Sequence, residues 1–267
     1  MTDDHIHELD TSVPHPARRY NYWLGGKDNF AADRTSAEQI LKIYPYARVA
    51  AVENRYFLQR VVRYLAADAG LRQFLDIGTG LPTADNTHEV AQNIAPEARV
   101  VYVDNDPLVL AHARALLTSS EQGRTAYLHH DLRDPQAILT DLQLKETLDL
   151  TEPVGLLLIA VLHFLPDTDQ ARTVVNTLLD ALPSGSYLAI SHATYDTVDP
   201  DTAAAARRQL AGEPFATRTR AEVTGFFDGL EIVEPGIVMV SDWRPDPGDH
   251  RPPAEQVSIY GALGRKP

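Results

Sequence analysis

Cysteine is absent from the sequence, basic residues are scarce and no apolar run is long. Without cysteine the chain forms no disulfide, thiolate metal site or cysteine nucleophile, which fits a reducing cytoplasm. Lys and Arg total 24 against 37 Asp and Glu, and the net charge of -13 disfavours a phosphate backbone as partner. The longest apolar run, Val154–Leu162, is far shorter than the ~20 residues that span a bilayer, and Met1–Glu8 lacks the features of a secretion signal. We therefore expect a cytoplasmic protein that binds neither nucleic acid nor membrane.

The pattern of the chain changes at Gly70. Residues 1–16 are polar and without apolar periodicity, which predicts a mobile arm. Ala17–Gly70 has a helical pattern, in which apolar residues recur at three- to five-residue spacing: Val49, Val52, Phe57, Val61 and Tyr64. After Gly70, short β-branched runs alternate with helical stretches, which predicts a parallel sheet with helices on both faces. The expected division is an N-terminal arm and helical cap, residues 1–70, and one α/β domain, residues 71–267.

The alternating part predicts five parallel strands and a different ending. The strands are expected at Gln73–Ile77, Arg99–Val103, Thr125–His129, Val154–Val161 and Tyr187–His192. Helices are expected at Thr83–Asn93, Pro107–Thr118, Pro135–Leu142 and Thr168–Leu182. Leu230–Val240 and Gln256–Gly264 are joined without a helix, which predicts an antiparallel pair at the sheet edge. The Pro-rich loop between them, residues 242–253, is either a plain surface excursion or a substrate lid.

A glycine turn follows the first predicted strand. The segment Asp76-Ile77-Gly78-Thr79-Gly80 continues an apolar run, and Thr83 is placed to cap the helix that comes next. Glycine lets the backbone turn sharply there and approach a ligand without a Cβ in the way. Alone the motif is a weak signal, because the same turn also joins strands to helices where no ligand binds.

Two further carboxylates follow the second and third predicted strands. Asp104 is placed to accept the hydroxyl hydrogens of a ribose, whereas Asp106 precedes Pro107 in a common helix start. Asp131 either accepts from an adenine amino group, with Leu132 packing on the ring, or caps another helix. Because the carboxyl ends of parallel strands share one edge of a sheet, these acids are expected to converge there.

A positively charged adenosine derivative fits these residues best. A nicotinamide site usually has a third glycine where this chain has Thr83. S-adenosylmethionine (SAM) has no pyrophosphate, and its sulfonium and amino groups suit the acid at Asp76. His129 and His130 lack a third ligand at a typical spacing, so no metal site is predicted.

Several segments resemble known methyltransferases. Those that resemble the class I SAM-dependent enzymes are Asp76–Gly80, Asp104, Asp131-Leu132 and Leu182–Tyr187. Others resemble the actinobacterial S-adenosyl methyltransferase family, once catalogued as a domain of unknown function: Ala17–Phe30, Asn54-Arg55, Leu81-Pro82-Thr83, Tyr102–Pro107 and Leu162-His163. The match covers nearly the whole chain, and the N-terminal block is its most specific part.

The resemblance implies a fold and a reaction. It implies a Rossmann-like α/β fold with a mostly parallel seven-stranded sheet, an antiparallel edge pair and an N-terminal helical cap. SAM would be the cofactor and methyl transfer the reaction. Pro82 departs from the class pattern, since many members have a third glycine there, which bears on the path of the turn. The fourth strand lacks the Asn-Pro-Pro-aromatic signature of enzymes that methylate the amino groups of bases.

The segment Tyr20–Asp33 is too polar for a core and too aromatic for an ordinary linker. It is predicted either to close over the methyl donor as a lid or simply to pack on the sheet as a helix and turn. As a lid, it would turn at Gly25 and Gly26 and cover the ligand with Tyr22 and Trp23. Lys27 or Arg55 would then pair with the carboxylate of the donor. The predicted cofactor-binding set is Asp76, Gly78, Thr79, Gly80, Asp104, Asn105, Asp131, Leu132, Tyr22, Lys27 and Arg55.

Methyl transfer requires alignment and exclusion of water but no nucleophile from the protein. If the acceptor is a hydroxyl group, a base assists, and His163 and His192 lie at the predicted ligand-binding rim. Each is also interpretable as a structural histidine. Asn86, His88 and Glu89 either face the acceptor or belong to the helix start.

Three functions are compatible with these patterns. The first is transfer of a methyl group from SAM to a small molecule. The second is a SAM-sensing protein that binds the cofactor without chemistry and works through partners. The third is a nicotinamide-dependent oxidoreductase, against which Asp76 and the missing third glycine both count.

Overall fold

The computed structural model describes residues 10–116 and 118–267, without the side chains of residues 113–116. The first nine residues of the predicted arm therefore lie outside the described part. Residues 10–15 are not helical, but the His15 backbone N–H donates to Asp33 at 2.8 Å, so the end of the predicted arm is held in place. Three helices then precede the sheet: α1 Pro16–Trp23, α2 Ala31–Ile43 and α3 Ala47–Ala67.

The five predicted parallel strands are present, with ends that differ by at most two residues. They are β1 Gln73–Ile77, β2 Arg99–Asp104, β3 Arg124–His129, β4 Gly155–Ile159 and β5 Tyr187–Ala193. Their order is β3-β2-β1-β4-β5, so the chain runs outward from β1 in one direction and from β4 in the other. In open α/β sheets, ligands bind outside the carboxyl ends of the strands at such a reversal of strand order.

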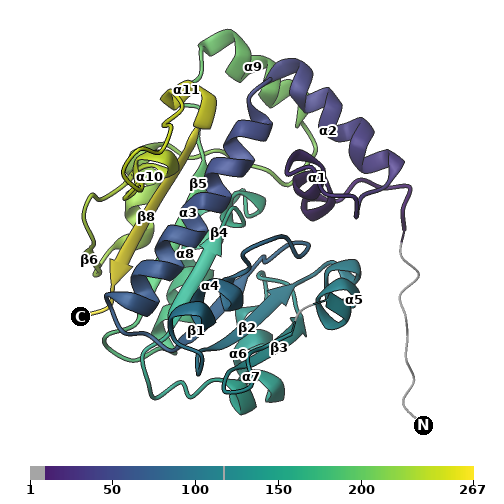
Figure 1. The fold of residues 1–267 in the computed structure, drawn as a ribbon. Coiled ribbons are helices and arrows are strands. Elements are labelled where there is room, and N and C mark those ends of the chain that lie inside the picture. Colours follow the sequence, from purple (N-terminus) through teal and green to yellow (C-terminus); the bar gives the residue numbers. More distant parts are fainter. Residues whose placement is uncertain (1–9, 117) are drawn as a thin grey trace.

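Helices cover both faces of this sheet. The helices between β1 and β6 are α4 Thr87–Ile94, α5 Pro107–Leu116, α6 Pro135–Thr140, α7 Leu142–Thr147, α8 Thr168–Asp180, α9 Pro200–Gln209 and α10 Arg220–Thr224. Of these, α9 lies beside α2 and not on a face of the sheet (Figure 1). The helices α3 and α4 pack together on one face, and α6 packs against α8 on the other (Figure 1). The purple α1 and α2 lie beyond the carboxyl ends of the parallel strands (Figure 1). The cap helices are therefore placed over the edge where a ligand is expected.

The antiparallel edge is built from three strands rather than two. Strand β8, Ile259–Arg265, follows the short helix α11, Ala254–Val257, and pairs antiparallel with β5. Its other side pairs with β6, Glu231–Ile232, and with β7, Val238–Met239. The predicted single strand Leu230–Val240 is thus split, because Pro235 removes a donor and Gly236 adopts a φ of +90°. The described sheet consequently has eight strands where seven were expected.

The apolar core is continuous under α3. Phe57 and Trp243 are fully buried there, and their rings meet edge to face with centroids 5.5 Å apart. Arg60 on the same helix donates to the Trp243 carbonyl at 2.8 Å, which anchors the C-terminal loop. Among the described residues, no helix is both long and apolar enough to cross a membrane.

Candidate donor site at the carboxyl edge

The turns after β1 and β4 touch each other at the point where the strand order reverses. Gly78 has a φ of +77°, and a Cβ built on it would lie 2.4 Å from Val161 Cγ2. Only glycine therefore fits between the two turns. The Gly78 backbone N–H donates to the Val103 carbonyl at 2.8 Å, and that of Thr79 donates to the same oxygen at 3.3 Å. The predicted glycine turn is thus held against the end of β2 as well.

Asp104 ties the glycine turn to the start of α5. One oxygen of its buried carboxylate accepts from the Gly80 backbone N–H at 2.8 Å, and the other accepts from the Asp106 N–H at 2.9 Å. Burial raises the pKa of Asp104 more than these hydrogen bonds lower it. Asp106 accepts from the Leu108 N–H at 3.0 Å, which confirms its predicted role at the helix start.

Asp76 is buried beneath the turn and carries an unusual pKa. It is 4% exposed, and its carboxylate accepts from the Thr87 hydroxyl at 2.6 Å. Burial raises its pKa from 3.8 to about 6, although the Thr87 hydrogen bond and the nearby Arg55 charge oppose that rise. At neutral pH the acid is ionised in a poorly solvated place, and a neighbouring cation would stabilise it.

The helix after the turn begins later than the sequence indicates. Asn86 precedes α4, and its backbone N–H donates to Glu89 at 2.6 Å in a capping box, so the predicted cap at Thr83 is wrong. Thr83 instead donates its backbone N–H to the Asn86 side chain at 3.1 Å. The predicted polar trio mainly builds this helix start, since Asn86 and Glu89 form the box and His88 is buried against Tyr102.

Asp131 lies beyond β3 and is linked to the second strand. Its carboxylate accepts from Asn105 Nδ2 at 3.1 Å and from the Arg133 guanidinium and backbone N–H. The Arg133 bonds lower the pKa of Asp131 to about 2. Leu132 beside it is buried in the core. Asp104 and Asp131 are thus joined through adjacent loops at one edge, as the strand pattern predicts, and the ligand roles of these residues stay predictions.

His129 and His130 are both engaged in other contacts. His129 Nε2 lies 3.0 Å from the Asn105 carbonyl, and His130 Nε2 lies 2.8 Å from the Asp141 carboxylate. Among the described residues, no group of three or more metal-binding side chains comes together.

His163 and His192 meet at the ends of β4 and β5, with ring centroids 5.7 Å apart. His192 is fully buried and bonded at both nitrogens, to the Ala193 carbonyl at 2.9 Å and to Arg218 at 2.7 Å. Because arginine only donates, the proton of a neutral His192 must lie on Nδ1. His163 is 8% exposed, and its Nδ1 has no partner among the described residues. Burial lowers the pKa of both rings, well below 6.5 for His163 and to about 4 for His192.

Two adjacent arginines fasten α1 across the candidate site. Arg18 donates to both oxygens of Asp106, at 2.8 and 3.0 Å. Arg19 donates to both oxygens of Glu213, at 2.9 and 2.7 Å, in the segment that follows α9. Both arginines are buried; Asp106 follows β2 and Glu213 follows α9, so the two partners come from the two halves of the chain that lie on either side of the reversal of strand order. The sequence places Arg18-Arg19 in a distinctive block, but no local pattern reveals these partners.

The chain turns after α1 at Gly25 and Gly26, where the sequence predicts a turn. Gly25 has a φ of +81°, and a Cβ on Gly26 would overlap the Asn21 side chain, so both glycines are needed where they stand. The Tyr22 hydroxyl donates to Glu38, and its ring lies under Arg48, with the guanidinium carbon 4.7 Å from the ring centre. Lys27 is exposed. The indole N–H of Trp23 is buried without a partner among the described residues.

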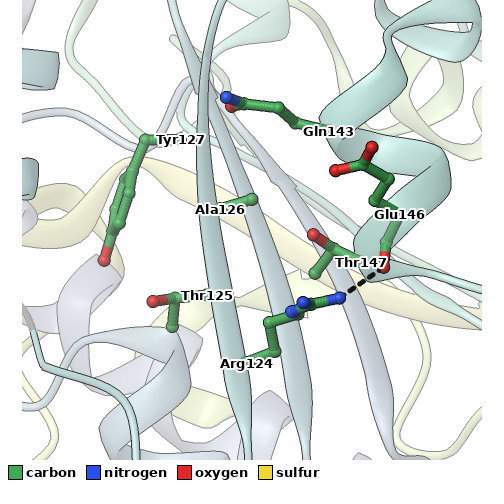
Figure 2. Close-up of a pocket in the computed structure, with 7 residues that line it drawn as sticks. All are labelled: Arg124, Thr125, Ala126, Tyr127, Gln143, Glu146 and Thr147. Atoms are coloured by element: carbon green, nitrogen blue, oxygen red, sulfur yellow. Dashed lines mark hydrogen bonds between the residues drawn. The ribbon is translucent and has the colours of Figure 1, made fainter.

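Two hollows lie apart from these acids. One, of about 280 Å³, follows the outer strand β3, where Arg124 donates to the Glu146 carbonyl at 2.7 Å (Figure 2). Thr125 and Tyr127 point to one side of that strand, and α7 supplies the opposite wall (Figure 2). A second, of about 510 Å³, lies between the α2–α3 junction and the segment after β5. Neither is lined by the carboxylates of the candidate donor site.

Comparisons with known proteins agree with this geometry. A family model described as S-adenosyl methyltransferase matches residues 2–267. None of the curated proteins compared with the chain matches it. Among solved structures, a DUF574 family protein from Streptomyces avermitilis is 48% identical with a TM-score of 0.91, and the match covers 97% of this chain and 100% of that one. A protein assigned as a methyltransferase from Thermobifida fusca is 41% identical with a TM-score of 0.89, covering 99% of both chains.

More distant structures share the fold. Human N-acetylserotonin methyltransferase, solved in complex with SAM, is 14% identical with a TM-score of 0.51, and the match covers 96% of this chain and 63% of that one. The Rossmann-like sheet with helices on both faces and an antiparallel edge is therefore that of SAM-dependent methyltransferases. The chain belongs to the S-adenosyl methyltransferase family, and its cofactor is SAM.

Proposed function

We propose that this enzyme, acting in the cytoplasm, transfers the methyl group of SAM to a small-molecule acceptor, with residues 1–70 as a cap over residues 71–267. The observation that carries the proposal is the Asp104 carboxylate, which is buried beside Gly80 at the reversal of strand order. Such a carboxylate can accept both hydroxyl hydrogens of a ribose. The net charge of -13 favours a small acceptor over a nucleic acid.

The residues at this edge fit the donor. Gly80 has a φ of +67°, and a Cβ built there would meet nothing within 4 Å, so the turn leaves room for a ligand against the backbone. Asp104 would hold the ribose, with Thr79 and Asn105 beside it. Asp131 and Leu132 would hold the adenine. The buried Asp76 would favour the positive end of the donor, and Arg55 or the exposed Lys27 would pair with its carboxylate.

The chain's own part in the reaction is alignment and exclusion of water. SAM supplies an activated methyl group that passes directly to the acceptor, so the protein needs no nucleophile. Trp23 of the cap would cover the donor, whereas the predicted contact of Tyr22 would be indirect, because its side chain packs against Glu38 and Arg48. His163 is the better-placed of the two histidines to accept a proton from a hydroxyl acceptor, because its Nδ1 is unpartnered while both nitrogens of His192 are bonded.

Asp104→Asn is expected to weaken binding of S-adenosylhomocysteine about 10- to 100-fold. The variant keeps the shape of the side chain but replaces one carboxylate oxygen with an NH₂ group. That group places N–H hydrogens against the N–H of Gly80, the N–H of Asp106 or the ribose hydroxyls. Isothermal titration calorimetry on the full chain measures the affinity. Asp228→Asn on the exposed surface is the matched control and should leave the affinity unchanged. Equal affinity in wild type and Asp104→Asn would exclude the assigned ribose contact.

His163→Ala is expected to lower methyl transfer about 100-fold or more without changing donor affinity, which is the usual size of a general-base contribution. Because the pKa of His163 lies well below 6.5, its ring is neutral at physiological pH, so the loss should be the same from pH 6.5 to 8. Transfer of labelled methyl groups from SAM into small molecules of a cell extract measures turnover. His130→Gln is the control. Undiminished labelling by His163→Ala would remove it as base, and donor binding without any labelled product from wild type would contradict methyl transfer.

A further inference from the structure

Three buried polar atoms on α1 and α3 have no hydrogen-bond partner among the described residues. They are Trp23 Nε1 at the end of α1 and Asn54 Oδ1 and Arg55 Nε, both on α3. An unsatisfied buried polar group costs about 1–3 kcal/mol, and native proteins keep few of them. Three on two touching helices therefore call for a ligand that satisfies them.

The orientation of Asn54 is fixed by its neighbours. The Tyr20 hydroxyl donates to the Ala51 carbonyl at 2.9 Å, so it must accept from Asn54 Nδ2, also at 2.9 Å. This contact determines which end of the amide is nitrogen and leaves Oδ1 as the free acceptor. Asn54 is 2% exposed, so the free oxygen is held inside the protein.

Arg55 is held equally firmly and faces the donor turn. Its Nη2 donates to the Asp85 carbonyl at 2.9 Å and to the Asn86 side chain at 3.2 Å, which fixes the plane of the guanidinium and leaves Nε–H free. The charge of Arg55 acts on both Tyr20 and Asp76, lowering the pKa of each against the effect of burial. The guanidinium is thus held against the segment that follows the glycine turn, and its charge reaches both Tyr20 of α1 and the buried Asp76.

Trp23 joins this group through the geometry of α1. It follows Tyr20 by three residues, and side chains three apart lie on the same face of a helix. Tyr20 is bonded to α3 at Asn54, so this face of α1 is turned toward α3. Tyr22 lies on another side, against Glu38 and Arg48.

The chemistry of the three atoms matches one kind of group. Two N–H donors, one of them on a cation, suit a carboxylate, and a carbonyl-type acceptor suits an ammonium group. We propose that Trp23, Asn54 and Arg55 form a binding site for a zwitterionic α-amino-acid group. The carboxylate accepts from Trp23 Nε1–H and Arg55 Nε–H, and the ammonium donates to Asn54 Oδ1. This inference rests on the proposed function, because the amino-acid group is that of SAM.

Calorimetry with two nucleosides tests the assignment. S-adenosylhomocysteine carries the amino-acid group, and 5′-deoxy-5′-methylthioadenosine lacks it. Each of the variants Trp23→Phe, Asn54→Ser and Arg55→Met is expected to weaken the binding of S-adenosylhomocysteine at least tenfold. The affinity for methylthioadenosine should change less than twofold. Tyr56→Phe, on the exposed side of α3, is the matched control. Melting temperatures of the unliganded variants establish that they are folded.

The outcomes separate this inference from the function on which it rests. If wild type binds both nucleosides and a variant of the three binds S-adenosylhomocysteine as tightly as wild type, the zwitterion site is wrong. Equal weakening of both nucleosides by a variant also overturns it, since that result indicates a structural role. If Lys27→Ala weakens the binding of S-adenosylhomocysteine and Arg55→Met does not, the ligand's carboxylate pairs with Lys27. That result would also overturn the zwitterion site. If wild type binds neither nucleoside, the proposed function fails together with the inference.

Fluorescence gives a second readout. Trp23 and Trp243 are the only tryptophans in the sequence, and Trp243 is fully buried in the core. S-adenosylhomocysteine should change the emission of the wild type, methylthioadenosine should change it much less, and Trp23→Phe should abolish the difference. An unchanged ligand-induced signal in Trp23→Phe would contradict a contact at the indole.

Discussion

Asp76→Asn is expected to stabilise the unliganded protein by about 3 kcal/mol at pH 7.5 and, at the same time, to weaken SAM binding. The pKa of Asp76 is about 6 in the folded protein against an ordinary value of 3.8, and that difference corresponds to about 3 kcal/mol. The cause is burial of a charge that only Thr87 and the nearby Arg55 partly compensate. Asparagine keeps an acceptor for the Thr87 hydroxyl and removes the charge.

The stabilisation by Asp76→Asn should grow as the pH rises. Between pH 4 and 6 the folded protein binds a proton at Asp76 that the unfolded chain has already released, so this group destabilises the wild type increasingly as the pH rises. Above pH 6 the cost is complete. Urea unfolding should therefore show nearly equal stabilities of wild type and Asp76→Asn at pH 4, and the full difference at pH 7.5. A difference that is the same at both values would contradict the buried charge.

The affinity of the wild type for SAM should rise with pH, whereas the contribution of Asp76 to its stability falls. A cation beside Asp76 lowers its pKa, so binding of SAM releases a proton and the affinity of the wild type rises with pH through about 6. In Asp76→Asn this dependence should disappear. An acid that costs stability in the free protein and favours a cationic ligand is the kind of compromise expected at a functional site.

Arg18→Met is expected to destabilise the protein by about 3 to 5 kcal/mol. Arg18 and Asp106 form a buried ion pair with two hydrogen bonds, and side-chain exposures of 5% and 0% leave no water to replace the lost partner. Removing one member of such a pair leaves an uncompensated buried charge. His15 Nδ1, 3.2 Å from Asp106, compensates only where it is protonated.

Urea unfolding of matched variants measures this effect. Arg63→Met breaks an ion pair with Asp246 in which both side chains are at least half exposed, and it should change stability little. The double variant Arg18→Met/Asp106→Asn should lose less free energy of unfolding than the two single variants lose together, because no buried charge is then left without a partner. Equal effects of Arg18→Met and Arg63→Met would show that α1 is not fastened by this pair.

The parallel part of the fold follows from local patterns. Short β-branched runs separated by helices predict each of the five strands, because strand and helix periods differ and the strands of a covered sheet are apolar throughout. The convergence of Asp104 and Asp131 at one edge follows from the same reasoning. The start of α4 was predicted wrongly. The helix begins after Asn86, which forms a capping box with Glu89, and not after Thr83.

Features that depend on distant contacts could not be predicted. The sequence indicates no partner for Arg18 or Arg19, and only the folded chain brings Asp106 and Glu213 to them. The antiparallel pairing of β8 with β6 and β7 is the edge pair that the sequence predicts, whereas the pairing of β8 with β5 and the division of residues 230–240 at Pro235 and Gly236 were not predicted. The unpartnered atoms of Trp23 and Arg55 emerge only when all other partners are known.

A crystal structure with S-adenosylhomocysteine would show where the methyl donor binds. We expect the ribose hydroxyls on Asp104, the adenine beside Asp131 and Leu132, and the amino-acid group beneath α1 at Trp23 and Arg55. A nucleoside seated elsewhere, such as in the hollow along β3 shown in Figure 2, with Asp104 free of contact, would contradict it.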